Sequence, residues 1–478
     1  MTIKHALAAA AAAAVLLAGC SATDGTSTTS SSTSSAAGAA SASAVTAADL
    51  LTGNEDATTT KDDEWSLDDA VDLDLTGPTV TITKAGVYRV SGDLHGGITV
   101  AAPDDALVVL VLDGAHITSS AGAAINVQTA DDVAVYLAAG STNTLSDASS
   151  YAADADVNAA LFSEADLTIS GTGSLTVTGN GADGINSEDD LVVLSGGITV
   201  QAADDGLRGK DSLTVKGGTI SVTAGGDGLK ADNEDEDTRG YIDVQDGSVT
   251  ITAGSDGVDA ASDLVVTGGR LTVSQSEEGL EAAHIVLAGG TVSTTSTDDG
   301  INATTGASGQ GGGEGDDGAT LTITGGTVDV DAEGDGLDSN GSAAMTGGTV
   351  TVSGPTRSGN SALDVNGTFP ISGGILVAAD AAGRSATPDA DSKQGWVYAA
   401  SSGAAGDTVT VTDAADKTVA TFTPTKAFTG LIVSTSDIVS AKTYSVVVKG
   451  ASVDATANQG GSVGTGGRGN GGGPGGSR

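Results

Sequence analysis

The sequence predicts an all-β chain that folds as a right-handed parallel β-helix and ends in a small antiparallel cap. Two observations lead to this prediction. A short unit of alternating apolar and polar residues recurs every 21 or 22 residues through the middle of the chain. The chain is also poor in bulky side chains, with 72 glycines among 478 residues and only 3% aromatic residues. Such a composition fills only a thin core, and a solenoid repeats a thin core from one coil to the next.

Each unit begins with an acid and a glycine, runs through a short alternating strand, and reaches a Gly-Gly pair before a second strand. The glycines that follow the acids are separated by 22, 22, 29, 22, 21 and 36 residues. They are Gly184, Gly206, Gly228, Gly257, Gly279, Gly300 and Gly336. The two longest intervals contain insertions, an acidic one at 232–237 and a glycine-rich one at 306–318. A period of this length, built from strands of period two, fits one coil of a parallel β-helix.

The N-terminus has the features of a bacterial lipoprotein signal. Lys4 and His5 precede an apolar run over residues 6–18, and the motif Leu-Ala-Gly-Cys ends at Cys20, the only cysteine. The run is shorter than the about 20 apolar residues that a membrane-spanning helix needs. We therefore predict a signal peptide at 1–19 and a lipid on Cys20, which anchors the protein in the membrane at the extracellular face of the bacterial cell. The alternative is an ordinary secretory signal that contains a cysteine.

Composition suggests the other boundaries. Residues 20–48 are rich in Ser, Thr and Ala and predict a flexible tether, whereas the glycine-rich residues 455–478 predict a disordered tail. Between them we expect the β-helix at 49–384 and the C-terminal cap at 385–454. A cap is physically sensible because the exposed end of a solenoid invites pairing with other chains.

The formal net charge of −43 excludes one class of function and suggests another. Nucleic acid binding needs a cationic surface that displaces counterions, so nucleic acid is not an expected partner. Acidity of this degree also fits simple solubility outside the cell. The sharper interpretation is that some of the carboxylates hold divalent cations.

Equivalent residues of successive coils stack about 4.8 Å apart and form columns. The apolar residue after each glycine is expected to point into the core, and the residue after that to point outward. Stacked like charges repel by about 1 kcal/mol per pair even in water, so we expect Ca²⁺ to neutralise the acids of these columns. The predicted metal ligands are Asp183, Asp205, Asp227, Asp256, Asp259, Glu278, Glu281, Asp299, Asp335 and Asp338.

A structural interpretation of the acid-glycine pair stays open beside the metal interpretation. In a turn, the aspartate would bond to its own backbone and the glycine would supply a positive φ. A transition-metal site is not expected, because the chain has one cysteine and four histidines.

Several segments resemble a family of bacterial carbohydrate-binding β-helix proteins. They are residues 86–92 (Gly-Val-Tyr-Arg-Val-Ser-Gly), 227–242, 246–258 and 422–428 (Phe-Thr-Pro-Thr-Lys-Ala-Phe), within a resemblance that covers about 65–450. It implies a pectate-lyase-like fold that binds Ca²⁺ and acidic plant cell-wall polysaccharide, notably polygalacturonate, with cellulose as a second candidate. The family is known for binding rather than cleavage. Glu278 in place of Asp, and Arg208 or Lys230 where a carboxylate could sit, make those coils weaker candidates for metal.

Three functions follow as hypotheses. The first is a non-catalytic, Ca²⁺-dependent surface protein that binds polysaccharide, with no catalytic residue. The second is a Ca²⁺-dependent, pectate-lyase-like polysaccharide lyase, for which Arg208 is the candidate base. Arg208, Lys210 and Lys230 form the basic cluster of this face, and compensation of neighbouring acids is the simpler account of them. The third is a structural spacer or adhesin.

Overall fold

The computed structural model describes residues 45–75, 77–152, 155–306, 316–357, 359–381 and 385–460, all of which belong to one compact unit that spans residues 43–478. The predicted signal peptide, the predicted lipidation site Cys20 and most of the predicted tether and tail lie outside the described residues. Within the described part of the chain, no helix is long and apolar enough to span a membrane.

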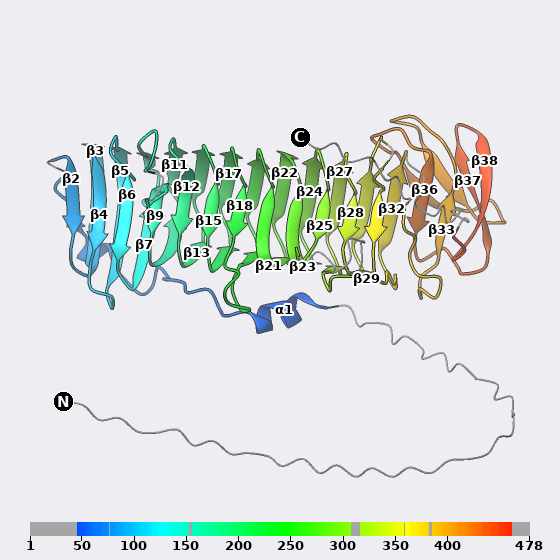
Figure 1. The fold of residues 1–478 in the computed structure, drawn as a ribbon, viewed down its shortest axis with the longest axis horizontal. Coiled ribbons are helices and arrows are strands. Elements are labelled where there is room, and N and C mark those ends of the chain that lie inside the picture. Colours follow the sequence, from blue (N-terminus) through cyan, green and yellow to red (C-terminus); the bar gives the residue numbers. More distant parts are fainter. Residues whose placement is uncertain are drawn as a thin grey trace, which may run out of the picture. The chain divides into compact units, whose positions relative to one another are not determined.

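A sheet of 34 strands dominates this unit, and nearly all of its pairings are parallel (Figure 1). The predicted all-β class is confirmed. The strands form three columns, because each strand pairs with the equivalent strand one coil further along the chain.

The first column follows the acid-glycine pairs. It contains β2 (Thr79–Ile82), β4 (Gly97–Ala101), β6 (Ile125–Thr129), β9 (Ala159–Ser163), β12 (Asp183–Ser187), β15 (Leu207–Gly209), β18 (Leu229–Ala231), the first parts of β21 (Val258–Val266) and β23 (Leu280–Leu287), β25 (Ile301–Ala303), β28 (Leu337–Ser339) and β31 (Leu363–Val365).

The second column comes next within each coil. It contains β1 (Val71–Asp72), the first parts of β3 (Gly86–His95) and β5 (Leu107–Thr118), β7 (Asp132–Leu137), β10 (Asp166–Gly171), β13 (Asp190–Val193), β16 (Ser212–Val215), β19 (Tyr241–Val244), the last parts of β21 and β23, β26 (Thr320–Ile323) and β29 (Ser342–Met345).

The third column follows the Gly-Gly turns. It contains the last parts of β3 and β5, β8 (Thr142–Ser146), β11 (Ser174–Gly179), β14 (Gly197–Ala202), β17 (Thr219–Ala224), β20 (Ser248–Thr252), β22 (Arg270–Ser276), β24 (Thr291–Ser296), β27 (Thr327–Ala332), β30 (Thr349–Ser353) and β32 (Ile375–Asp380).

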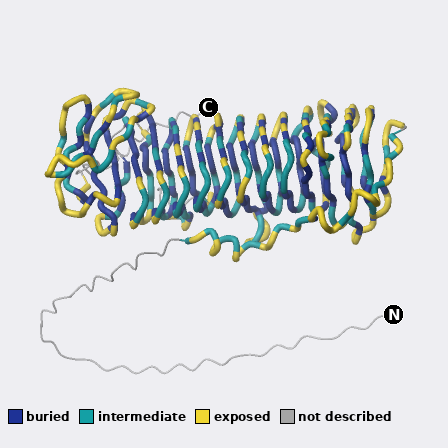
Figure 2. Tube along the Cα trace, turned by 180° about the vertical axis from the view of Figure 1, so that it is seen from behind, coloured by how far each residue is buried: buried dark blue, intermediate teal, exposed yellow. Residues whose placement is uncertain are grey.

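The core is a stack of small and branched apolar side chains that runs through all the coils. The residues after the acid-glycine pairs point into it as predicted, and Ile185, Leu207 and Leu229 are each 0% exposed. Along the third column buried and exposed residues alternate. Figure 2 shows that buried residues recur in coil after coil along the unit. The Gly-Gly turns use positive φ at one glycine, for example Gly218 (φ +90°) and Gly348 (φ +81°), which a side chain rarely adopts.

Near the C-terminal end the strands turn antiparallel. β32 pairs with β36 (Gly430–Ser434), which also pairs with β33 (Trp396–Ala399). A separate antiparallel sheet of four strands has the order β35 (Thr418–Phe422), β34 (Val409–Thr412), β37 (Thr443–Val448) and β38 (Ala451–Thr456).

The described N-terminal residues run along the outer face of the second column. Helix α1 (Ala47–Gly53) starts at a capping box between Thr46 and Asp49, and the short 3₁₀ helix η1 (Leu67–Asp69) precedes β1. Residues 54–62, which follow α1 and lead toward η1, are called the strap. The Thr58 amide donates to Asp190 Oδ2 (2.8 Å), the Thr60 amide donates to Thr168 Oγ1 (3.1 Å), and Glu55 pairs with Arg239 (2.5 Å).

Candidate functional site

The acids that precede the glycines form a ladder, here called the acidic ladder, along one edge of the first column. Its members are Asp183, Asp205, Asp227, Asp256, Glu278, Asp299 and Asp335. Oδ1 of one acid accepts a hydrogen bond from the backbone amide of the next: Asp205 N to Asp183 is 3.1 Å and Asp227 N to Asp205 is 2.8 Å. The same bond joins Asp256 to Asp227 (2.9 Å), Glu278 to Asp256 (3.1 Å) and Asp335 to Asp299 (2.5 Å). The ladder is therefore first a structural device that ties neighbouring coils together.

This geometry differs from the turn chemistry that the sequence left open. The carboxylates bond to the next coil and not to their own backbone, and none of the glycines that follow them has a positive φ. Glycine is required for space. A Cβ at Gly206 would meet Val222 Cγ1 at 2.3 Å and the Gly228 carbonyl oxygen at 2.5 Å, so a side chain here would push the core and the next coil away.

We expect Gly206→Ala to lower the free energy of unfolding by about 1–3 kcal/mol, because the added methyl group overpacks the coil. Denaturant unfolding of the two proteins measures the difference. Gly53→Ala is the matched control, since a Cβ there meets nothing within 4 Å. An equal change in the free energy of unfolding for both variants would show that the structure accommodates a methyl group at Gly206 without loss of stability.

Two cations neutralise the middle of the site. Lys230 Nζ lies 2.5 Å from Asp227, 3.5 Å from Asp205 and 3.7 Å from Asp259. Burial alone would lower the pKa of Lys230, but its hydrogen bond to Asp227 and the charges of Asp205, Asp227 and Asp259 outweigh that effect and raise the pKa. These coils therefore supply part of their own counter-charge.

Arg208, the candidate base of the lyase hypothesis, is held firmly by acids. Its Nη1 donates to Glu188 (2.6 Å) and Asn186 Oδ1 (3.0 Å), and its Nε donates to Asp232 (3.0 Å). Burial opposes the charge, yet the hydrogen bonds to Asp232 and Glu188 raise the pKa of Arg208 above its ordinary value. A general base must first be deprotonated, whereas the acids around Arg208 favour its charged form, so this environment fits charge compensation.

At one end of the ladder, Asp183, Asp204 and Asp205 bring carboxylate oxygens within 4.8 Å of one another. Both oxygens of Asp183 already accept hydrogen bonds, one from the Asp205 amide and one from Asn158 Nδ2 (2.8 Å). Burial and the charge of Asp205 raise the pKa of Asp183 to about 7. Since Lys230 also lies near Asp205, this group has less capacity left for a metal.

Further along, Asp299, Asp335 and Asp338 form a second group whose oxygens lie within 4.8 Å of one another. Within the described ranges, no lysine or arginine forms an ion pair with any of the three. Burial and the charges of Asp299 and Asp335 raise the pKa of Asp338 to about 8. Burial and, beyond it, the charge of Asp335 raise the pKa of Asp299 to about 7. This group has the unbalanced negative charge that a cation would relieve.

The coils before this group add acids and an amide. Glu278 accepts from Asn302 Nδ2 (2.9 Å), and burial together with its hydrogen bond to Glu281 raises the pKa of Glu278 to about 8. Asn302 stands in register between Glu281 and Asp338, and its buried Oδ1 has no hydrogen-bond partner among the described residues. An unpartnered buried oxygen costs free energy, and a bound cation would remove that cost.

Sequence reasoning missed a third acidic group, Asp166, Asp189 and Asp190, at the start of the second column. An acid is the first residue of β7, β10 and β13, at 132, 166 and 190, and this pattern is a weaker sequence signal than an acid before a glycine. The strap amide of Thr58, the Ser212 hydroxyl (2.6 Å) and Arg239 (3.3 Å) all engage Asp190. These contacts fit a structural role that fastens the strap.

Comparison with known proteins identifies a family model and a curated relative that match the chain. A family model described as carbohydrate-binding domain-containing protein matches residues 76–318, just over half of the chain. A curated protein of Acetivibrio thermocellus with the same description is 39% identical over 157 residues, which cover 32% of this chain and 55% of that protein. The chain thus spans about half the length of this relative.

Among solved structures, the polysaccharide lyase-like protein from C. thermocellum, gadolinium derivative, matches with 33% sequence identity and a TM-score of 0.40. The match covers 47% of this chain and 92% of that chain. By the match of the family model, the chain belongs to the carbohydrate-binding domain-containing proteins.

Proposed function

We propose that this protein binds acidic polysaccharide of the polygalacturonate type through Ca²⁺ held on the acidic ladder, and that it does not cleave the polysaccharide. Membership of a carbohydrate-binding family supports the general activity. The observation that carries the calcium proposal is the group of Asp299, Asp335 and Asp338, which gathers three carboxylates without a counter-charge from the described residues.

The spacing of this group suits Ca²⁺. Oxygen ligands lie about 2.4 Å from Ca²⁺, so two ligands of one ion are at most about 4.8 Å apart, and these three carboxylates have oxygens within that separation. Ca²⁺ takes six to eight oxygens, and Asn302 Oδ1 is one rung away. Ligand positions that remain open would go to water or to the carboxylates of a uronate.

The charge of the chain explains why a cation belongs in the complex. A protein with a net charge of −43 repels a polyanion, and the described cations of the ladder region are already paired with its own acids. A Ca²⁺ ion shared between the ladder and a uronate turns this repulsion into a bridge. The coils of Arg208 and Lys230 remain the weaker candidates for metal.

We also propose that the stacked coils wind as a right-handed parallel β-helix. The support is the three-column parallel pairing, because connections between parallel strands of one sheet are right-handed in about 98% of cases. The lipid anchor on Cys20 and the position outside the cell membrane are part of the same proposal, supported by the apolar run that precedes this cysteine.

The test is retention on immobilised polygalacturonate. We expect the protein to be retained in Ca²⁺, to be released by chelator, and to generate no absorbance from unsaturated sugar products. Asp338→Asn should weaken retention and Ca²⁺ affinity by at least about tenfold, because it removes one charged ligand. Asp329→Asn, which removes an equal charge from an exposed position in β27, should leave both unchanged.

Other outcomes would contradict parts of the proposal. Product formation would make the protein a lyase. Ca²⁺ binding without retention would support the metal site and contradict the binding of acidic polysaccharide, as expected for a spacer or adhesin. Retention that resists chelator would remove Ca²⁺ from the mechanism.

A further inference from the structure

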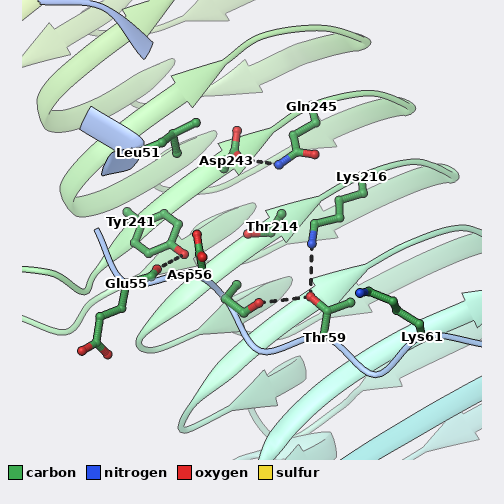
Figure 3. A pocket seen from close by; sticks show the side chains of 11 residues that line it. Leu51, Glu55, Asp56, Thr59, Lys61, Thr214, Lys216, Tyr241, Asp243 and Gln245 are labelled. Atoms are coloured by element: carbon green, nitrogen blue, oxygen red, sulfur yellow. Dashed lines mark hydrogen bonds between the residues drawn. The ribbon is translucent and has the colours of Figure 1, made fainter. Parts of the chain in front are cut away.

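A pocket lies between the strap and the outer side of the second column, on a different face from the acidic ladder (Figure 3). Its volume is about 380 Å³, which is within the range of small-molecule sites. Strands β16 and β19 form its floor, and α1 and the strap form its wall. The acidic ladder borders the first column, so this pocket is separate from the proposed Ca²⁺ site.

Four polar side chains form the floor in a two-by-two array. Thr214 and Asp243 are register partners on β16 and β19, and Lys216 and Gln245 lie two residues further along the same face. Figure 3 shows these side chains rising from neighbouring strands toward the strap. Strands are about 4.8 Å apart and alternate residues about 7 Å apart, so the array presents hydrogen-bonding groups at the scale of one sugar ring.

The coil repeat does not require a carboxylate at this place. The register partners of Asp243 along the second column are Val192, Thr214, Val265, Val286 and Thr322. Asp243 is 3% exposed, and burial raises its pKa although Gln245 and Lys216 act in the opposite direction. Burying a carboxylate that the other coils lack at this position lowers stability. The simplest explanation is that Asp243 serves a purpose other than folding.

Two buried oxygens of the floor are unpartnered. Asp243 Oδ2 accepts from Gln245 (2.7 Å), but Asp243 Oδ1 and Thr214 Oγ1 have no hydrogen-bond partner in the described part of the chain. Lys216 donates to Thr59 Oγ1 (3.1 Å), and an ammonium group has two further N–H donors. Acceptors and donors thus stand side by side, as a ligand with several hydroxyl groups requires.

The charge of the pocket favours a neutral ligand. Glu55 is paired with Arg239, which leaves Asp56 and Asp243 against Lys61 and Lys216. Two carboxylates and two ammonium groups balance. This balance neither attracts a uronate strongly nor concentrates enough carboxylates to hold Ca²⁺.

We propose that this pocket binds a neutral pyranose sugar, with Asp243 Oδ1 and Thr214 Oγ1 accepting from its hydroxyl groups and Lys216 donating to them. The protein then has two sugar-binding surfaces of different chemistry. One is bridged by Ca²⁺ and takes acidic chains, and the other works without metal and takes neutral residues.

The experiment uses the whole protein in chelator, which disables the proposed Ca²⁺ surface and keeps the two proposals distinguishable. Cellotetraose, xylotetraose, galactotetraose and a galacturonate tetramer are titrated, and binding is followed by saturation-transfer NMR. We expect at least one neutral tetramer to bind and the galacturonate tetramer to bind at least about tenfold more weakly.

Variants locate the binding. Asp243→Asn keeps the shape, and Gln245→Ala lies at an exposed position, so neither is expected to unfold the protein. Asp243→Asn should weaken neutral-sugar binding by about tenfold, the loss of one hydrogen bond to a charged group. Gln245→Ala should also weaken it, because Gln245 donates to Asp243 Oδ2 and holds that carboxylate in place. Asp329→Asn and Gln201→Ala, on exposed positions of the third column, are the matched controls and should bind as the unchanged protein does.

Failure of all three neutral tetramers to bind would overturn the proposal, as would equal affinities across the variants. Preference for the galacturonate tetramer in chelator would overturn the neutral class. None of these results depends on whether polygalacturonate is retained in Ca²⁺.

Discussion

In chelator, the protein is expected to become less stable as the pH rises from 5.5 to 8.5. Ordinary aspartyl and glutamyl groups titrate near pH 4, whereas burial and the charges of neighbouring acids raise several folded-state pKa values in the acidic ladder and in Asp259 and Asp338 beside it. These are about 6 for Asp256 and Asp335, about 7 for Asp183, Asp259 and Asp299, and about 8 for Glu278 and Asp338.

The sign follows from proton counting. Between pH 4 and pH 8 the folded protein holds protons that the unfolded chain has released, so stability present at low pH is lost as the pH passes through the folded-state values. One carboxyl group with a folded pKa of about 7 contributes about 2 kcal/mol of this loss between pH 5.5 and 8.5. These carboxyl groups raise one another's pKa and titrate as a cluster, so their contributions do not add, and we expect a total on the order of 4 kcal/mol.

Denaturant unfolding at the two pH values measures this difference. Saturating Ca²⁺ should flatten or reverse it, because the metal binds the deprotonated carboxylates and only in the folded state. A stability that rises with pH in chelator would mean that the ladder acids are ionised at little cost in the folded protein. The unfolding free energy of Asp329→Asn should change with pH as it does in the unchanged protein, whereas that of Asp338→Asn should change less. This difference would assign the pH effect to the buried acids around the ladder.

Lys230→Met is expected to lower the free energy of unfolding by about 3 kcal/mol at pH 8. The ammonium group lies within 4 Å of Asp205, Asp227 and Asp259, and its side chain is only 23% exposed. Removing one partner from a largely buried charge cluster leaves the remaining charges uncompensated, which is costly. Methionine fills a similar volume, so the loss reports charge more than packing.

Two further measurements identify the cause. The loss of stability should be smaller at pH 5.5, because protonation neutralises part of the negative charge that Lys230 no longer compensates. Ca²⁺ should also stabilise the variant more than the unchanged protein. Lys393→Met, at an exposed position without an ion pair among the described residues, should have a stability within about 0.5 kcal/mol of the original. An equal deficit at both pH values would point to lost packing instead.

The repeating part of the fold was accessible from the sequence because its signal is periodic. The acid-glycine spacing predicted which residues share a column, and the buried Ile185, Leu207 and Leu229 confirm the predicted inward position. The same spacing brought Asp299, Asp335 and Asp338 into one predicted set, and the structure places them together. Periodicity therefore identifies neighbours even across an insertion such as 306–318.

Periodicity does not tell how neighbours bond. That Oδ1 of Asp205 accepts the amide of Asp227 depends on side-chain rotamers, which a residue count does not contain. The counter-charge of Lys230 was recognised as an alternative, but its reach to three acids depends on the same detail. The repulsion argument for Ca²⁺ thus overstated the charge of the middle coils and applies best to the later ones.

The strap was inaccessible for another reason. It binds the second column through single long-range contacts, such as Thr58 to Asp190, which are 132 positions apart in the sequence. These contacts do not repeat along the chain, so no sequence pattern predicts them. The pocket with Asp243 depends on the strap and was missed with it.

The acidic ladder also has a direction. In two runs, from Asp183 to Glu278 and from Asp299 to Ser361, Oδ1 of each acid accepts the backbone amide of the next member of the run. A whole coil inserted within either run would find a donor on one side and an acceptor on the other. Gene duplication can therefore lengthen such a protein one coil at a time without redesigning its joints, and evolution can set the length of its surface independently of the chemistry at any one rung.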